Sequence, residues 1–505
     1  MILSKNALNS IKAANLELPR EELFNLPEKV LQFGTGVLLR GLPDYFIDKA
    51  NKQGLFNGRV AVVKSTSKGG TAEFEEQDGL YTICVRGIEN GHPVEENIIS
   101  SAISRVLVAD QQWGEILDIA VSPLLKVIVS NTTEVGIQLV EESIHQKTPV
   151  SFPAKLLAVL YARYESLGES ADAELAVIAT ELISDNGKKL ETIVRQLITF
   201  NQLEGAFVKW LDTKVHFCNS LVDRIVPGKP DTASFEKLEA ELGYKDQLLI
   251  MAEPYRLWAI EGNQKVSELL NLEAADHGVI VRPDIEIFKE LKVRLLNGSH
   301  TLTSGIAYLL GIDTVTKAMN NEATRNYVNE LMMHEIAGAI PYKVAEVEAM
   351  AFANTVIDRF ANPSIQHLWI NITFQYTMKM KIRILPVLLN YYKLFQKVPS
   401  HIAFGFAAFL LFMKSDKKEG NQYFGNYNGH TYAITDDEAE YFYSAAQQKE
   451  SDYVNLMLID RKLWGEDLSA LAGFNEAVKD NYNNILKYGM AGALARLDQT
   501  LEVSK

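Results

Sequence analysis

The chain of 505 residues is too long for one ordinary hydrophobic core, so two or three domains are expected. Its 47% hydrophobic and 23% charged residues are typical of a soluble globular protein. The formal net charge of −14 argues against nucleic-acid binding, which requires a basic face. The two cysteines provide neither a disulfide framework nor a zinc cluster, which suits a reducing cytoplasm.

No segment has the pattern of a targeting signal or a membrane span. Residues 1–22 lack the apolar core and the small-residue cleavage site of a signal peptide. The most apolar run, residues 402–413, is too short to cross a bilayer and is interpreted as a buried helix. We therefore expect a cytoplasmic protein that binds neither membrane nor nucleic acid.

A glycine turn follows the first apolar strand candidate. Gly34 and Gly36 come directly after that strand, and a helical pattern follows them. Strand, glycine turn and helix are the parts with which a dinucleotide-binding unit meets a pyrophosphate. The third glycine of the GxGxxG motif is absent, because Leu39 holds its place and Arg40 and Gly41 follow. An ordinary strand-to-helix turn remains the alternative.

Strand and helix patterns then alternate and predict a Rossmann-type α/β domain over residues 1–280. The strand candidates are residues 30–33, 59–63, 80–85, 106–108, 126–130, 176–183, 214–219 and 248–252. Several of them end in small polar residues, at the edge where open α/β sheets bind ligands. Lys64 follows the second strand, where a carboxylate for the ribose 2′-hydroxyl is expected, so the motif alone leaves NAD and NADP open.

From about Asp284 the patterns become helical and predict an all-α domain over residues 281–505. The longest helical patterns cover residues 324–338, 344–360, 373–394, 438–457 and 468–497. Ligand sites favour domain interfaces, so the polar side of the first helix is expected to face the α/β domain.

Three polar residues of that first helix share one side. At about 100° per residue, Asn297 falls about 140° and His300 about 80° from Lys292. A proton donor, a hydrogen-bond donor for the oxyanion and a second polar contact are what the reduction of a carbonyl needs. Gly298 costs the helix about 1 kcal/mol relative to alanine, and close approach of a ligand is one gain that would offset this. An amphipathic helix whose polar face meets water is the alternative.

Several blocks of the sequence together resemble the mannitol dehydrogenase (long-chain polyol dehydrogenase) family, most closely its tagaturonate reductase branch. They include QFGTGVLLR, VSNTTEVGI, ELISDNG, FCNSLVDRIVPG, KVRLLNGSH and KMKIRILP, and the resemblance extends from about residue 30 to residue 386. It implies an NAD-binding Rossmann-type domain and a helical catalytic domain. It also implies reversible, NAD(H)-dependent reduction of tagaturonate to altronate in hexuronate catabolism.

The resemblance assigns roles to individual residues. Lys292 matches the general acid/base, Asn297 and Asn186 match donors to the reacting oxygen, and His300 matches a substrate contact. Cofactor contacts are expected at Gly34, Gly36, Arg40, Lys64, Thr132, Thr133 and Glu134, and substrate contacts at Asp223 and Lys379. No metal is expected, because the histidines show no close-spaced ligand pair.

One position departs from the mannitol dehydrogenase pattern, in which an arginine precedes the substrate-side lysine by eight residues. Here that position is Asn371, while Lys381 and Arg383 follow Lys379. A hexuronate carries a carboxylate that a neutral ketose lacks, and binding it needs a cation or several N–H donors. We expect Lys379, Lys381 or Arg383 to bind this carboxylate. The alternative is that some of them point into solvent.

Other functions remain open at this stage. The same chemistry on fructuronate, giving mannonate, or on a neutral polyol is the nearest. A different two-domain dehydrogenase acting on phosphorylated sugar acids would need phosphate-binding arginines in the helical domain. A non-catalytic dinucleotide-binding sensor would lose nothing when Lys292 is removed. The protein is expected to be a monomer or a small homo-oligomer.

Overall fold

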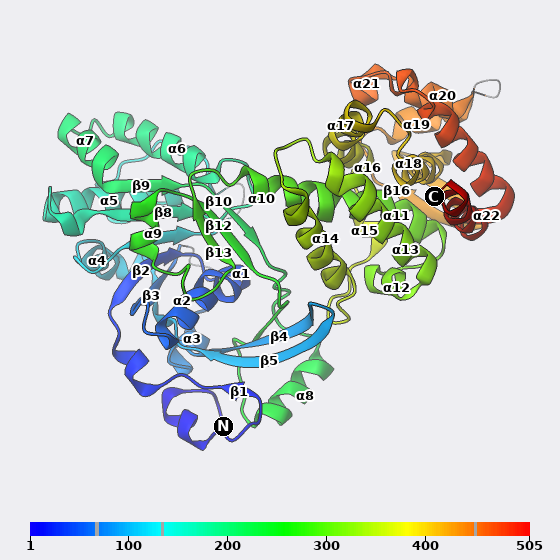
Figure 1. The fold of residues 1–505 in the computed structure, drawn as a ribbon. Coiled ribbons are helices and arrows are strands. Elements are labelled where there is room, and N and C mark those ends of the chain that lie inside the picture. Colours follow the sequence, from blue (N-terminus) through cyan, green and yellow to red (C-terminus); the bar gives the residue numbers. More distant parts are fainter. Residues whose placement is uncertain (66–69, 133–135, 449–451, 505) are drawn as a thin grey trace. The chain divides into compact units, whose positions relative to one another are not determined.

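The computed structural model describes residues 1–65, 70–132, 136–448 and 452–504. The chain forms two compact units (Figure 1). Unit 1 comprises Met1–Gly87 and Pro93–Ile285, and unit 2 comprises Ile88–His92 and Glu286–Lys505.

A six-stranded parallel sheet forms the centre of unit 1, with strand order β6-β3-β2-β7-β8-β9. Its strands are β2 (Glu28–Phe33), β3 (Arg59–Lys64), β6 (Ile103–Val108), β7 (Val127–Ser130), β8 (Leu175–Ala179) and β9 (Val215–Cys218). Numbered along the chain, this order is the 3-2-1-4-5-6 of a dinucleotide-binding Rossmann fold. The predicted α/β class of the N-terminal half is confirmed.

Both faces of this sheet are covered, which explains why its strands read as continuous apolar runs. Alternate residues such as Leu31 and Phe33 point into one core, and Val60 and Val62 point into the other. The first core contains α4 (Ala109–Ala120), α5 (Phe152–Leu167), α6 (Asn186–Phe200) and α7 (Gly205–Lys214). The second contains α1 (Val37–Gly41), α2 (Pro43–Lys52) and α9 (Gln264–Leu270).

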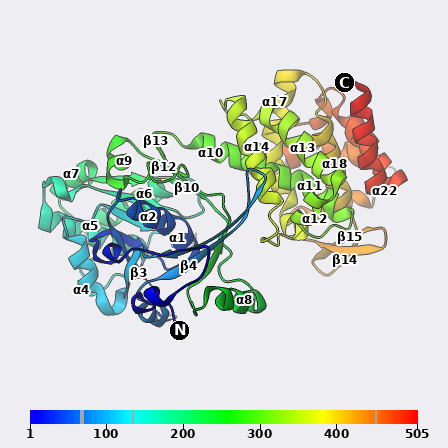
Figure 2. The same cartoon turned by 60° about the horizontal axis from the view of Figure 1, so that its bottom comes forward.

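Two smaller sheets complete unit 1, and most of their strands were not predicted. One sheet has the order β1-β5-β4-β11 and the other β10-β12-β13. Figure 2 labels β4 of the first sheet and all three strands of the second. Their bounds are β1 (Leu16–Glu17), β4 (Tyr81–Glu89), β5 (His92–Ser100), β10 (Ser220–Asp223), β11 (Ile250–Ala252), β12 (Leu257–Glu261) and β13 (Val279–Arg282). The first half of β5 is exposed and carries charged residues, so its sequence gives little strand signal. Helices α3 (Ala72–Glu76) and α8 (Thr232–Leu242) also belong to unit 1.

Unit 2 is mainly helical, as predicted, with one small sheet of its own and with Ile88–His92, where β4 ends and β5 begins. Its α-helices are α10 (Glu286–Leu291), α11 (Ser299–Leu309), α12 (Val315–Asn320), α13 (Glu322–Glu330), α14 (Glu346–Phe360), α15 (Trp369–Ile372), α16 (Tyr376–Lys379), α17 (Leu385–Phe395), α18 (Ser400–Met413), α19 (Ala439–Ala446), α20 (Tyr453–Leu458), α21 (Arg461–Trp464) and α22 (Phe474–Ser504). Three π-helices interrupt them: η4 (Lys292–Gly298), η5 (Leu331–Ile336) and η7 (Met380–Ile384). The antiparallel sheet, absent from the prediction, consists of β14 (Ser415–Glu419), β15 (Gln422–Tyr427) and β16 (His430–Ile434).

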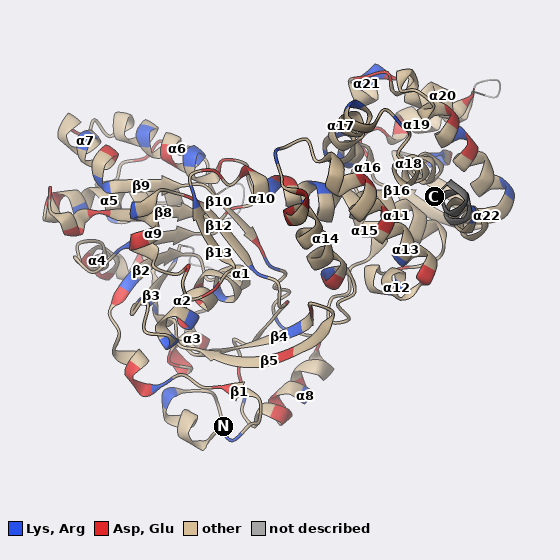
Figure 3. Cartoon of the chain, viewed as in Figure 1, with Lys and Arg blue, Asp and Glu red and all other residues tan. Residues whose placement is uncertain are grey.

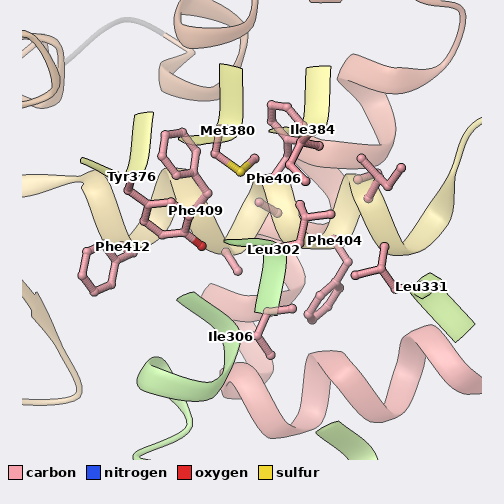
Figure 4. Close-up of a cluster of buried hydrophobic side chains, with 14 of the residues drawn as sticks. Leu302, Ile306, Leu331, Tyr376, Met380, Ile384, Phe404, Phe406, Phe409 and Phe412 are labelled. Atoms are coloured by element: carbon pink, nitrogen blue, oxygen red, sulfur yellow. The ribbon is translucent and has the colours of Figure 1, made fainter. Parts of the chain in front are cut away.

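The core of unit 2 surrounds α18, which is buried on all sides from His401 to Met413. Its phenylalanines meet α11 and the α16–η7 segment, and Figure 4 shows them among Leu302, Tyr376, Met380 and Ile384. The prediction of a buried helix here is confirmed, and its burial explains its uniformly apolar composition. Helix α11 and the α16–η7 segment therefore pack on one aromatic core.

Charges of both signs alternate along the ribbons of the two units (Figure 3). Within the described part of the chain, no helix combines the length and the apolar character needed to cross a bilayer.

Candidate active site

The carboxyl ends of β2, β3 and β7 lie side by side in unit 1, because Phe33 is in register with both Val63 and Ser130. Gly34 follows with φ +132°, and a β-carbon there would lie 2.9 Å from the carbonyl oxygen of Asn131. Only glycine fits that turn. A β-carbon on Gly36, directly before α1, would meet nothing within 4 Å. One glycine thus permits the turn and the other leaves it uncovered, which suits the pyrophosphate of a dinucleotide.

Gly41 supplies the close packing that the third glycine gives in a GxGxxG motif. A β-carbon at Gly41 would lie 2.8 Å from both methyl carbons of Val226 and 3.4 Å from Cδ1 of Ile250. The short helix α1 therefore packs against these side chains through its last residue. The sequence contained this signal, a glycine two positions beyond the expected one.

Arg40 lies in the interior of unit 1. Its Nη1 donates to the carbonyl of Leu248 at 2.5 Å, and its guanidinium lies 5.4 Å from the ring centre of Tyr81. Burial lowers its pKa, and Tyr81, Asp246 and Asp44 act in the opposite direction. The expectation that Arg40 contacts the cofactor stays a prediction. Although Arg40 lies close to the glycine turn in sequence, its side chain is directed into the core.

A buried carboxylate organises the ends of β7 and β8. The backbone N–H and the hydroxyl of Thr132 donate to Oε1 of Glu181 at 2.9 and 3.1 Å, and the Ser130 hydroxyl donates to Oε2 at 3.2 Å. Glu181 is 2% exposed and lies two residues beyond the end of β8, and it was not singled out from the sequence. Lys64 ends β3 and is also buried. Thr133 and Glu134 lie outside the described residues.

Asn186 begins α6 with a side chain that is fully hydrogen-bonded. Its Nδ2 donates to the carbonyls of Glu181 and Ser220 at 3.0 and 2.9 Å. Its Oδ1 accepts from the backbone N–H groups of Gly187 and Ser220 at 2.9 Å. For Asn186 to donate to a reacting oxygen, its Nδ2 would have to give up one of its hydrogen bonds to the carbonyls of Glu181 and Ser220. Asp223, at the end of β10, is buried in the same unit.

Lys292 and Asn297 lie on the π-helix η4 of unit 2, not on the α-helix that the 100° period assumed. In a π-helix the hydrogen bonds run from residue i to residue i+5, so residues five apart lie about one turn apart. The lysine and the asparagine therefore follow one another along one side of the helix. Lys292 is half-buried. The amide of Asn297 has no hydrogen-bond partner in the part of the chain that the structure describes, so it is available to a ligand.

Gly298 allows close approach of a second helix. A β-carbon there would lie 3.3 Å from Cδ1 of Ile384 in η7. The two π-helices therefore pack closely at this glycine, which explains why a residue unfavourable in helices is used.

His300 is buried among aromatic rings. It stacks on Phe360 with ring centres 3.9 Å apart and planes 6° from parallel, and it meets the rings of His367 and Trp369 edge-on at 5.3 and 5.7 Å. Its Nε2 is buried without a hydrogen-bond partner among the described residues. Burial is the main cause that lowers its pKa well below the usual value, with His367 and the nearby cations contributing. The imidazole is therefore neutral at physiological pH.

Lys379 and Arg383 belong to this surrounding of His300, whereas Lys381 is exposed. Burial and the charge of Arg383 lower the pKa of Lys379 to about 8, against the opposing effect of Asp436. The Nζ of Lys379 donates to a backbone carbonyl, that of Ile372, at 2.8 Å. Burial also lowers the pKa of Arg383. Across the described residues, neither cation forms an ion pair with a carboxylate.

Asn371, which stands where the mannitol dehydrogenase pattern has an arginine, is exposed on α15. Searched over the described residues, the chain contains no group of three His, Cys, Asp or Glu side chains that could hold a metal ion.

Two family models match consecutive parts of the chain. Residues 28–274 match the mannitol dehydrogenase Rossmann domain, and residues 284–486 match the mannitol dehydrogenase C-terminal domain.

Similar proteins carry one recurring name. The chain is 37% identical to the altronate oxidoreductase of Halalkalibacterium halodurans over 481 residues, which cover 93% of each chain. It is 34% identical to the altronate oxidoreductase of Bacillus subtilis, over 93% of this chain and 95% of that one.

Two solved structures share the fold. The structure of D-sorbitol dehydrogenase in substrate-free form has a TM-score of 0.78 at 18% identity, and covers 98% of this chain and 100% of that one. The ternary complex of Pseudomonas fluorescens mannitol 2-dehydrogenase with NAD and D-mannitol has a TM-score of 0.65 at 21% identity, and covers 99% and 100%.

Proposed function

Since the chain belongs to the mannitol dehydrogenase family, whose members are oxidoreductases acting on CH–OH groups, we propose that it is a ketone reductase. In this proposal it reduces tagaturonate to altronate, reversibly and with NADH. The altronate oxidoreductase name of the relatives supports a sugar acid as substrate. The resemblance to tagaturonate reductases in the sequence blocks supports the same choice.

The turn at Gly34 and Gly36 is the proposed site of the NAD pyrophosphate. The observations that support it are Gly34, where a side chain would not fit, and the uncovered start of α1. Bound there, the reduced cofactor supplies the hydride that the ketone carbon receives.

Lys292 and Asn297 are the proposed groups at the reacting oxygen. The ammonium of Lys292 donates the proton in reduction and its amine removes it in oxidation. The Asn297 amide, which lacks a protein partner among the described residues, donates to the oxygen as negative charge develops on it. In this proposal Asn186 contributes as a donor only if one of its two backbone contacts opens. The neutral His300 serves as a hydrogen-bonding contact for a substrate hydroxyl.

The observation that carries the choice of a sugar acid is the pair of cations beside His300. Lys379 and Arg383 are partly buried, and neither forms an ion pair with a carboxylate of the described residues, although the charge of Asp436 partly offsets that of Lys379. A desolvated cation without a counter-ion is costly, so an anionic ligand would stabilise this arrangement. The carboxylate of a hexuronate supplies that anion, whereas a neutral ketose does not.

The test is NADH oxidation, followed by absorbance, with tagaturonate, fructuronate and fructose. Turnover of tagaturonate in preference to the others is expected, and Lys292→Ala should lower kcat by on the order of 10²–10⁴-fold with folding intact. Preference for fructuronate would move the protein to the other hexuronate, and preference for fructose would remove the role of the cation pair. If NADH binds to the protein but none of the three is reduced, the proposed function fails and the alternative of a dinucleotide-binding sensor is favoured.

A further inference from the structure

Two π-helices of unit 2, η4 and η7, are far apart along the chain but pack against each other. η4 carries Lys292 and Asn297, and η7 ends one turn beyond Lys379 and contains Arg383. π-helices are rare and frequently occur at functional sites. The distance between η4 and η7 therefore determines how far Lys379 and Arg383, the proposed carboxylate contacts, lie from Lys292, the proposed proton donor.

Arg294 connects these two helices from the η4 side. Its Nε and Nη2 donate to the two carboxylate oxygens of Glu290 at 2.9 and 3.0 Å. Its Nη1 donates to the backbone carbonyls of Ile382 and Arg383 at 2.5 and 3.1 Å. The Arg294 side chain is only 9% exposed. The two-pronged pairing with Glu290 fixes the plane of the guanidinium and leaves its third nitrogen directed at η7.

Arg383 crosses the same contact in the opposite direction. Its Nη1 donates to the hydroxyl of Thr301 at 3.1 Å and lies 3.5 Å from the carbonyl oxygen of Asn297. The Thr301 hydroxyl itself donates to the Asn297 carbonyl at 2.7 Å. Arg294 of η4 thus contacts the backbone of η7, and Arg383 of η7 contacts the backbone of η4. Arg383 is also a proposed substrate contact.

We propose that Arg294 is a positioning residue that holds the Arg383 segment at a fixed distance from Lys292 and Asn297. The carboxylate of the sugar acid is then held where its ketone meets the proton donor. This inference rests on the proposed function, because it acts through the carboxylate contact of Arg383. A lysine at position 294 would keep one N–H contact to η7 but lose the two-pronged pairing with Glu290.

The test is a double-mutant cycle on the full-length enzyme with tagaturonate and NADH. Arg294→Met should lower kcat/KM for the sugar acid at least tenfold while the KM for NADH changes less than twofold. In an Arg383→Met background the same change should cost less than threefold, because the residue through which it acts is gone. Arg294→Lys should restore part of the loss, and it serves as the working variant if Arg294→Met does not fold.

The outcomes separate the inference from the proposed function. If Arg383→Met raises the KM for the sugar acid but the Arg294 loss is the same in both backgrounds, Arg294 is a general structural residue and the inference fails alone. A loss that follows only the fraction of folded enzyme, equal for every substrate, also refutes it. If Arg383→Met leaves the KM unchanged, the carboxylate site and the inference fail together.

Discussion

His300 lies flat on Phe360, with ring centres 3.9 Å apart and planes 6° from parallel. The aromatic ring covers one face of the imidazole, and the nearby cations oppose its protonation. The side chain is thus kept as a neutral hydrogen-bonding group. A histidine acting as an acid or base needs a pKa near the working pH, and this one is displaced far from it.

We therefore expect His300→Asn, which keeps a hydrogen-bonding amide, to retain more activity than His300→Ala. The pH profile of kcat/KM should show no ionisation near pH 6.5 that disappears in either variant. An ionisation in that range that His300→Asn abolishes would show that the imidazole titrates during turnover.

Arg383→Met should raise the KM for the sugar acid about 10- to 100-fold, because a hydrogen bond to a charged group contributes about 1.5–3 kcal/mol. Lys381→Met is the matched control, since Lys381 is exposed on the same segment and lies outside the cation pair. Its KM should stay within twofold of wild type. Equal effects of the two substitutions would point to the overall positive charge of the segment and not to a defined site.

Lys379 gives the carboxylate contact a pH dependence. With its pKa lowered to about 8, its ammonium is charged below that pH and is lost as the pH rises through it. The KM for the sugar acid should therefore increase between about pH 7.5 and pH 9.5. Lys379→Arg, whose guanidinium stays charged, should flatten this increase. A wild-type KM that does not change across the range would exclude Lys379 from the contact.

Asp44 lies fully buried beneath the glycine turn, where its Oδ2 accepts from Nε2 of Gln32 at 3.2 Å. Burial raises its pKa from 3.8 to about 7, so the folded protein binds this proton more tightly than the unfolded chain. The resulting stabilisation is complete below about pH 4 and is lost as the pH rises through 7. Asp44→Asn, which carries no charge, should therefore be more stable than wild type at pH 8, by a few kcal/mol, and similar at pH 4. Thermal or urea unfolding at pH 4 and pH 8 measures the difference in stability between Asp44→Asn and wild type. An equal difference at the two pH values would contradict a raised pKa of Asp44.

The glycines on either side of α1 should respond differently to alanine. The added methyl of Gly41→Ala meets Val226 at 2.8 Å, so the loss of about 1–3 kcal/mol from overpacking exceeds the helix-propensity gain of about 1 kcal/mol. Gly36→Ala has room for its methyl, so stability should be unchanged while the KM for NADH rises. Urea unfolding and NADH kinetics on the two variants separate packing from cofactor binding. An equal loss of stability in both variants would contradict the assignment of Gly41 to packing and of Gly36 to cofactor binding.

The parallel sheet could be predicted because its buried strands are continuous apolar runs, several of them followed by small polar residues. Lys379, Arg383 and His300 could be named from their spacing and from the family resemblance, and the structure gathers them in unit 2. Strands β12 and β13 are four or five residues long and pair only through tertiary contacts, so local pattern gave no basis for them. The Asn428-Gly429 pair between β15 and β16 is a strong hairpin signal that the helical interpretation of this half passed over.

What escaped prediction at the site depends on side-chain direction and helix type. Arg40 is adjacent to the glycine turn in sequence, yet its guanidinium is directed into the core. The neighbours of His300 come from α14 and α15 and are 60 or more residues away along the chain, beyond any local pattern. An α-helical period assigned Lys292 and Asn297 to directions about 140° apart, whereas the π-helix brings them into line.

The length of the segment from Lys292 to Gly298 follows from this helix type. A π-turn contains more residues than an α-turn of the same height, so the segment holds surplus backbone between two α-helices. Deletion of a single residue, such as Val293, would let the helix revert to the α-helical period. The flanking α-helices would stay in register, because the deletion removes the residue that the π-turn had absorbed. Lys292 and Asn297 would then be separated by four positions in place of five, so the change would fall on the spacing of these two side chains. Substitutions between the lysine and the asparagine are therefore easier to accommodate than any change in their number.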